Sequence, residues 1–284
     1  MDTRDLSGSV AVVTGAGSGI GRATALEAAR RGADVGLCDV DEAGLHATAR
    51  AIRDLGRRAT ARVADVSHAD AVEAFAGAVR AELGAPRLLV NNAGIGVGGA
   101  FLEVPLEEFG RVVGINLMGV VHGCAAFLPA MIEAGHGGHV VNVASMAGYV
   151  AGPLMTSYHA TKFGVIGFSE SLRAELALHG IGVTAICPGV IDTNITRTSR
   201  FYGAGWDESQ RERMVRAFQR RGYGPDKVAR KILLAVRRNR AVAPVSPEAW
   251  AGYYLKRLAP WAVAAFGRHS MRRIAREQAA RPPG

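Results

Sequence analysis

The 284-residue sequence is poor in cysteine and in aromatic side chains, and its apolar residues occur in short runs. The three cysteines, Cys38, Cys124 and Cys187, are scattered and odd in number, which argues against a disulfide framework and against a Cys-x-x-Cys metal site. We therefore expect no metal and a reducing compartment, the cytoplasm. No run approaches the roughly 20 apolar residues of a membrane-spanning helix, and the charged start MDTRDLSG has no apolar signal segment behind it.

Charge is unevenly distributed along the chain, although the composition is that of a globular protein with a sizeable core. The formal net charge is +9. Residues 1–196 contain 14 Lys and Arg against 19 Asp and Glu, whereas residues 197–284 contain 20 against 6. A basic C-terminal third therefore follows a mildly acidic body, and this asymmetry needs its own explanation.

A glycine-rich segment, TGAGSGIG at 14–21, separates an apolar β-branched run from an alanine-rich stretch of helical periodicity. In this context a glycine turn binds the pyrophosphate of a dinucleotide, because the backbone can approach closely and the helix N-terminus favours an anion. The alternative is a tight strand-to-helix turn without a ligand. The loop residues expected at the cofactor are Gly15, Gly17, Ser18, Gly19, Ile20 and Gly21.

An acidic residue, Asp39, ends the second predicted strand, residues 34–38. A carboxylate at this place accepts hydrogen bonds from the adenosine ribose hydroxyls and repels a 2′-phosphate. Neither Ser18 nor Val40 supplies a positive charge, so the pattern favours NAD over NADP. Alternatively, Asp39 caps the next helix, 42–55, a role that Asp41 can fill equally well.

Further strands are predicted at 58–64, 87–90, 139–143, 181–187 and 241–245, with helical stretches between them. The longest of these stretches are 107–133 and 155–178. This alternation predicts a parallel sheet that helices cover on both faces. Ligands are then expected at the carboxyl ends of the strands.

Tyr158 and Lys162 are four residues apart and share one face of a predicted helix. A neighbouring ammonium favours the phenolate, so it can turn a tyrosine with an ordinary pKa near 10 into a base at neutral pH. Ser145, just after the strand 139–143, can reach the same reacting oxygen. By itself such a pair is also typical of a solvated helix face, and Asn116 by itself indicates a structural hydrogen-bond network.

Together, TGAGSGIG, NNAG at 91–94, Asn116, Ser145, YHATK at 158–162 and PGVIDT at 188–193 resemble the motifs of the short-chain dehydrogenase/reductase family in order and spacing. The resemblance covers about residues 6–195. It implies an α/β fold, a single doubly wound Rossmann-type domain with a seven-stranded parallel sheet of order 3-2-1-4-5-6-7. It also implies an NAD-dependent oxidoreductase that interconverts an alcohol and a ketone by hydride transfer.

The resemblance also implies a role for each motif residue. Tyr158 is the general acid/base, and Lys162 lowers its pKa and binds the nicotinamide ribose. Ser145 holds the substrate oxygen, and Asn116 holds a water of the proton relay. Further cofactor contacts are implied for Asp65 and Val66 at the adenine, for Asn92, Ala93 and Gly94 at the fourth strand, and for Pro188, Gly189, Val190 and Thr193 near the nicotinamide carboxamide.

Residues 194–224 resemble the variable substrate lid of the family, inside a catalytic domain of residues 1–247. The lid's aromatic side chains either line an apolar pocket or pack the lid onto the body. Few charged residues are candidates for the site, so we expect a hydrophobic alcohol or ketone that is steroid-like, retinoid-like or long-chain. Two alternatives stay open, an NADPH-dependent 3-oxoacyl-thioester reductase and a non-catalytic NAD-binding regulator or scaffold. The expected pocket residues are Met146, Leu154, Met155, Phe201, Tyr202 and Trp206.

Residues 248–284 form a basic extension that the family core does not require. Basic residues interleaved with aromatic ones suggest a helix lying on an anionic membrane surface. The alternative is a helix packed on its own domain or on a neighbouring subunit, and nucleic acid is disfavoured because no reader motif is present. The resemblance implies a homotetramer or homodimer formed through the helices that carry Asn116 and Tyr158.

Overall fold

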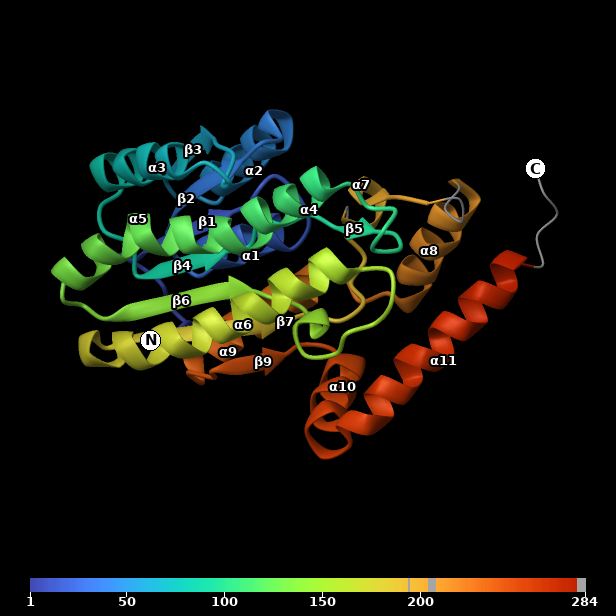
Figure 1. Cartoon of the computed structure of the whole chain (residues 1–284). Coiled ribbons are helices and arrows are strands. Elements are labelled where there is room, and N and C mark those ends of the chain that lie inside the picture. The colour runs from blue at the N-terminus through green and yellow to red at the C-terminus, as the bar shows by residue number, and fades with distance from the viewer. Residues whose placement is uncertain (194, 204–207, 280–284) are drawn as a thin grey trace.

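A seven-stranded parallel sheet forms the centre of the molecule, seen in a computed structural model that describes residues 1–193, 195–203 and 208–279 (Figure 1). The strand order is β3-β2-β1-β4-β6-β7-β9. Counted along the chain without the two short strands of a separate sheet, this is 3-2-1-4-5-6-7, which confirms the predicted fold. The strands are β1 Val10–Thr14, β2 Asp34–Asp39, β3 Ala59–Val63, β4 Leu88–Asn91, β6 Gly138–Val143, β7 Ile181–Cys187 and β9 Val242–Pro244.

Helices cover both faces of the sheet, as predicted (Figure 1). Within β1, Ala11 and Val13 belong to one core and Val10 and Val12 to the other, since successive side chains of a strand point to opposite faces. One core contains α1 (Gly19–Arg30), α2 (Glu42–Asp54) and α9 (Pro225–Arg237). The other contains α3 (Ala69–Glu82), α5 (Gly119–Glu133) and α6 (Thr156–Leu176).

The predicted helical stretch 107–133 is interrupted in the middle. It consists of α4 (Leu106–Val113), a π-helical turn (Gly114–Met118) and α5. Contrary to the expectation from run length, Leu106–Glu133 is long and apolar enough to cross a membrane by length and composition alone. Because 56% of its apolar window is buried within the fold, core packing accounts for this composition.

A second, two-stranded sheet joins the segment after β7 to the segment after β4. β5 (Val97–Gly98) follows β4 and pairs in parallel with β8 (Arg200–Phe201). The predicted lid, residues 194–224, also contains α7 (Ile195–Thr198) and α8 (Glu208–Arg221). Strands of two residues are too short to show the alternation from which a strand is predicted, so this sheet was not predicted.

The C-terminal extension contains two helices rather than one, α10 (Pro247–Leu258) and α11 (Pro260–Ala279). The break lies at Ala259, because Pro260 lacks an N–H and restricts the residue before it. α10 is packed on the body, where Ala249 is fully buried and its carbonyl accepts the Tyr149 hydroxyl at 2.7 Å. α11 extends away from the sheet (Figure 1).

Candidate active site

The glycine-rich loop between β1 and α1 is packed too closely for side chains. Gly15 has a φ of +64°, and a Cβ added there would lie 2.8 Å from the Cα of Ala93. A Cβ added at Gly21 would lie 2.0 Å from the carbonyl oxygen of Gly15. Helix α1 then begins at Gly19 without a side-chain cap and without an acidic residue in its first turn. This loop and the N–H groups of the helix start fit an anionic group such as a pyrophosphate.

The end of β4 holds this loop in place. The Nδ2 of Asn92 donates to the carbonyl oxygens of Thr14 and Gly15, both at 3.0 Å. The Oγ1 of Thr14 accepts the N–H groups of Asn92 at 3.0 Å and of Ala93 at 3.1 Å. Thr14, which the sequence reasoning did not select, is therefore a buried link between two strand ends. The signal that the sequence offered for Thr14 was a threonine at the end of an apolar strand.

Asp39 lies at the end of β2 beside the same loop. Its Oδ2 accepts the N–H of Gly17 at 2.7 Å, and its Oδ1 accepts the N–H of Asp41 at 2.9 Å. The cap of α2 is Asp41, which accepts the N–H of Gly44 at 3.1 Å. The alternative role of Asp39 as the helix cap is therefore wrong, because its carboxylate faces the glycine loop instead.

Asp65 and Val66 follow β3 at the same edge of the sheet. The Oδ1 of Asp65 accepts the N–H of Ser67 at 2.9 Å and its hydroxyl at 2.7 Å. The carbonyl of Val66 lies 2.9 Å from the Nδ1 of His122 on α5. Internal hydrogen bonds thus fix both residues next to the proposed adenine end.

Ser145 and Tyr158 come together from different elements. Ser145 is buried and starts the short 3₁₀ turn Met146–Gly148 after β6. Its Oγ accepts the N–H of Ala147 at 3.1 Å and donates to the carbonyl of Pro188 at 3.4 Å. Tyr158 lies in the first turn of α6. Burial raises the pKa of Tyr158, and a hydrogen bond with Ser145 acts in the opposite direction.

Lys162 is buried one turn further along α6. Its Nζ donates to the carbonyl of Val143 at 2.8 Å and lies 5.7 Å from the centre of the Tyr158 ring. Burial lowers the pKa of Lys162 to about 8. The two side chains are thus neighbours, as their spacing predicts, but the pKa of Tyr158 shifts upward in this environment.

Asn116 is fully buried in the π-helical turn between α4 and α5. Its Oδ1 accepts the N–H of Ile95 at 2.8 Å, and its Nδ2 donates to the Ile95 carbonyl at 2.9 Å. A Cβ added at Gly94 would lie 3.3 Å from this Oδ1 and 3.6 Å from the Nζ of Lys162. Asn116 and Lys162 therefore border the same space beside Gly94.

The loop Pro188–Thr193 follows β7 and completes the site. A Cβ added at Gly19 would lie 3.5 Å from the Cβ of Thr193, so this residue sits over the start of α1. The N–H of Val190 donates to the Oε1 of Glu248 at 2.8 Å. The sequence reasoning did not find Glu248, because it lies in the extension, 58 residues from its partner.

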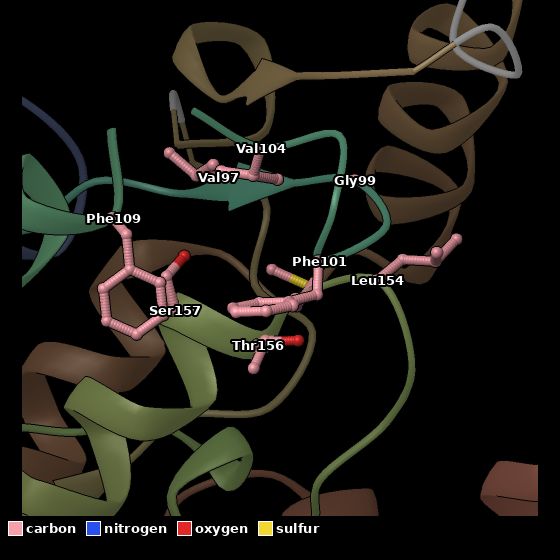
Figure 2. A pocket seen from close by; sticks show the side chains of 9 residues that line it. Val97, Gly99, Phe101, Val104, Phe109, Leu154, Thr156 and Ser157 are labelled. Carbon is pink, nitrogen blue, oxygen red and sulfur yellow. The ribbon is translucent and has the colours of Figure 1, made fainter. Parts of the chain in front are cut away.

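A small apolar pocket lies between the segment after β4, α4 and the start of α6 (Figure 2). Leu154 and Met155, two of the expected substrate residues, line it together with Phe101 and Phe109, which were not predicted. Phe201 and Tyr202 lie next to it, where β8 pairs with β5. Met146 packs in the core beside α6 and does not line this pocket. Trp206 lies outside the described residues.

The cysteines do not form a site. All three are buried and free, and burial raises the pKa of each thiol to about 12. Within residues 1–193, 195–203 and 208–279, no group of three or more His, Cys, Asp or Glu is placed to hold a metal ion.

Known proteins resemble this chain along most of its length. A profile of the short chain dehydrogenase family matches residues 9–201. The oxidoreductase EphD of Mycobacterium tuberculosis is 50% identical over 255 residues, 88% of this chain and 43% of EphD. The chain thus spans less than half the length of that relative.

Two other relatives have activities in their names. The 1-deoxy-11-beta-hydroxypentalenate dehydrogenase of Streptomyces exfoliatus is 38% identical over 202 residues, 70% of this chain and 74% of that enzyme. Estradiol 17-beta-dehydrogenase 11 of Macaca fascicularis is 34% identical over 197 residues, 68% of this chain and 65% of that enzyme.

A solved structure agrees with the fold and the family. The short chain dehydrogenase/reductase of Burkholderia phymatum in complex with NAD matches with a TM-score of 0.81 and 33% identity, over 89% of this chain and 94% of that one. The profile match covers both the glycine loop and the Tyr158–Lys162 segment. The chain belongs to the short-chain dehydrogenase/reductase family.

Proposed function

We propose that this protein interconverts a hydrophobic secondary alcohol and its ketone, with NAD as the hydride carrier. The observation that carries the proposal is the meeting of four polar side chains next to the glycine loop. Ser145 interacts with Tyr158, and Lys162 and Asn116 border the space beside Gly94. Polar groups that converge from separate elements at the carboxyl ends of the strands are what a reacting oxygen needs.

Each side chain has a defined task in the oxidation direction. NAD supplies the acceptor for the hydride of the carbinol carbon. Tyr158, as phenolate, accepts the hydroxyl proton at its phenol oxygen, while Ser145 donates a hydrogen bond to the substrate oxygen. Lys162 stabilises the phenolate through its positive charge. In reduction the same groups act in reverse, with Tyr158 as the acid.

Asn116 acts through the backbone in addition to the expected relay. Both polar atoms of its amide bond Ile95, so the amide fixes the chain directly after Gly94. We propose that this holds Gly94 close to the Nζ of Lys162, and that a relay water binds at this place.

The same site has the groups to hold the cofactor. The glycine loop and the start of α1 would bind the pyrophosphate, and Asp39 would accept hydrogen bonds from the adenosine ribose. The N–H of Val190 donates to Glu248. The carbonyl of Val190 would then accept a hydrogen bond from the carboxamide N–H of the nicotinamide. Val40 and Asp41 follow Asp39 without a positive charge, which supports NAD over NADP.

The substrate class is proposed from the surroundings of the site. An apolar pocket lies beside the start of α6, the helix that carries Tyr158 (Figure 2). Its lining includes Leu154, Met155, Phe101 and Phe109. The names of two relatives describe dehydrogenases of a hydroxypentalenate and of estradiol. The apolar character of the lining and these two names support a steroid-like, retinoid-like or long-chain secondary alcohol.

A substrate panel tests the proposal. Purified protein is incubated with hydrophobic secondary alcohols and either NAD⁺ or NADP⁺, and turnover is followed at the NADH absorbance band. We expect turnover of at least one alcohol with a preference for NAD⁺. A 3-oxoacyl thioester with NADPH tests the alternative reductase, and binding of NADH without turnover on any substrate would favour the non-catalytic regulator.

A second proposed role concerns the surface of α11. Trp261 is 75% exposed and Phe266 68% exposed, and Arg268 and Arg272 lie on the same helix. Exposed aromatic and basic side chains on one helix favour contact with an anionic membrane surface. Co-sedimentation with anionic liposomes tests this with a Trp261→Ser/Phe266→Ser variant, because removal of residues 248–284 would also remove the packed helix α10. Equal sedimentation of variant and wild type would exclude the role.

The assembly is proposed from exposed apolar side chains on the predicted interface helices. Met118, next to α5, is 38% exposed and Phe163 on α6 is 40% exposed. A homodimer or homotetramer would cover them, and light scattering coupled to size-exclusion chromatography measures this. The free cysteines support a cytoplasmic location.

A further inference from the structure

The loop Pro188–Thr193 is fixed by two segments that lie far along the chain. The N–H of Val190 donates to the Oε1 of Glu248 at 2.8 Å. The N–H of Asp192 donates to the carbonyl of Tyr223 at 3.2 Å, and the Tyr223 hydroxyl donates to the carbonyl of Val245 at 2.9 Å. Glu248, Tyr223 and Val245 all lie beyond the region 9–201 that the family profile matches.

Glu248 is itself held in place from the other side. Its Oε2 forms an ion pair with Arg221, the last residue of α8, and its side chain is 22% exposed. Although burial alone would raise the pKa of Glu248, hydrogen bonds, including that from the N–H of Val190, lower it. The carboxylate is therefore ionised at neutral pH and bridges the lid helix α8 to the loop.

There is no spare room between this carboxylate and the loop backbone. A Cβ added at Gly189 would lie 2.3 Å from the Oε1 of Glu248. On its other side the loop is joined to the catalytic serine turn, since the carbonyl of Pro188 accepts the N–H of Met146 at 2.8 Å and the hydroxyl of Ser145 at 3.4 Å. A shift of Glu248 would thus move the backbone that carries the Ser145 contact.

Helix α10, which carries Glu248, is packed against the body of the protein. Ala249, the next residue, is fully buried, and its carbonyl accepts the Tyr149 hydroxyl at 2.7 Å. Tyr149 also packs edge-on against Tyr253 on α10, with ring centres 5.5 Å apart. The start of the C-terminal extension is therefore part of the wall of the site.

We propose that Glu248 is a positioning residue for the nicotinamide end of the cofactor, a step that rests on the proposed function. It acts through the backbone of Val190 by fixing the direction of the peptide groups around it. The adenine and pyrophosphate ends are held by other elements, the glycine loop and Asp39. Loss of Glu248 should therefore weaken binding of the nicotinamide end alone.

The test compares two ligands that differ only by the nicotinamide. NADH and ADP-ribose are titrated into full-length wild type and into Glu248→Ala, with melting temperatures recorded alongside. We expect Glu248→Ala to weaken NADH binding about tenfold, the effect of losing one charge-assisted hydrogen bond, and to leave ADP-ribose binding within about twofold. Glu248→Gln keeps an acceptor oxygen for Val190 and should recover most of the NADH affinity. Glu175→Ala, an exposed position on α6, is the control.

Two results would overturn the proposal. One is an equal loss of affinity for NADH and ADP-ribose, which would indicate a general structural role; the other is unchanged NADH binding. If Glu248→Ala does not fold, Glu248→Leu replaces it, because leucine fills the space without an acceptor. Glu248→Leu is then compared with Glu248→Gln. An equal ratio of NADH affinity to ADP-ribose affinity in these two variants would also overturn the proposal. Wild type that binds neither ligand would instead contradict the proposed function.

Discussion

The side chain of Asn116 and the backbone of Ile95 form a closed pair of hydrogen bonds, with the Oδ1 accepting at 2.8 Å and the Nδ2 donating at 2.9 Å. The pair joins the π-helical turn before α5 to the chain leaving β4. Since Asn116 has no exposed surface, neither bond can be replaced by water without rearrangement. One amide thus determines how Gly94 approaches Lys162.

Asn116→Ala should destabilise the protein and reduce turnover together. Two half-buried backbone groups of Ile95 lose their partners, which costs about 1–3 kcal/mol of the free energy of unfolding. Urea unfolding measures this change, and steady-state rates measure the loss of turnover. Thr161→Val leaves both Ile95 bonds in place and removes the 3.4 Å partner of Asn116, together with the 2.8 Å bond from the Thr161 hydroxyl to the Tyr158 carbonyl, so it should cost about 1 kcal/mol. Comparable stability losses in the two variants would contradict the importance of the Ile95 pair.

Tyr158→Phe should abolish turnover while cofactor binding stays nearly unchanged. The variant loses the only oxygen of this side chain that can exchange a proton with the substrate, and loss of a general acid/base lowers rates by about 10²–10⁴-fold or more. Rates are followed through NADH absorbance and binding through NADH fluorescence. Tyr254→Phe, at an exposed tyrosine on α10, is the matched control and should turn over normally. Normal rates in Tyr158→Phe would remove Tyr158 from the mechanism.

Asp39→Asn should shift cofactor preference towards NADP⁺. The neutral amide no longer repels a 2′-phosphate, yet its oxygen can still accept the N–H of Gly17. We expect the ratio of kcat/KM for NADP⁺ to that for NAD⁺ to rise about tenfold or more, equivalent to about 1.4 kcal/mol. Asp41→Asn, which changes the cap of α2 instead, serves as control and should leave the ratio alone. An unchanged ratio in Asp39→Asn would mean that this carboxylate does not select the cofactor.

Lys162 should make stability depend on pH in the alkaline range. Burial lowers its pKa from 10.5 to about 8, so between these values the unfolded chain binds a proton that the folded chain does not. The contribution of Lys162 to stability therefore rises as pH increases from about 8 to about 10.5, by about 3 kcal/mol. Relative to Lys162→Met, wild type should gain this amount in urea unfolding between these two pH values.

Other groups that titrate in this pH range contribute equally to wild type and to Lys162→Met, so their contributions cancel in the difference between the two proteins. Lys231→Met, at an exposed lysine on α9, provides the reference and should follow wild type at every pH. If the difference in free energy of unfolding between wild type and Lys162→Met stayed constant with pH, burial would not lower the pKa of Lys162.

Local patterns were sufficient for the sheet and for the shared helix face of Tyr158 and Lys162. The β-branched runs at β1 and β7 are apolar on both faces, which only a covered parallel strand tolerates, and the four-residue spacing of Tyr158 and Lys162 places them on one helix face. Asp39 was placed correctly at the end of β2, but its role as a possible helix cap could not be decided, because Asp41 offers the same chemistry two residues later.

Long-range contacts could not be read in the same way. The partner of Asn116 is 21 residues away and is a backbone group, so no side-chain pattern reports it. Strand β8 pairs with β5 across about 100 residues, and each strand is only two residues long. The break at Ala259 was readable from Pro260, yet the packing of α10 depends on a buried contact with Tyr149, 100 residues earlier.

The sequence by itself determined the fold family, the glycine turn between β1 and α1 and the shared helix face of Tyr158 and Lys162, because each depends on spacing within one turn, strand or helix. Only the tertiary structure decided that Glu248 reaches Val190, that Asn116 holds Ile95, and that burial raises the pKa of Tyr158 and lowers that of Lys162. The physical reason is that desolvation and hydrogen bonding depend on which groups meet after folding, and those meetings join segments far apart in the chain.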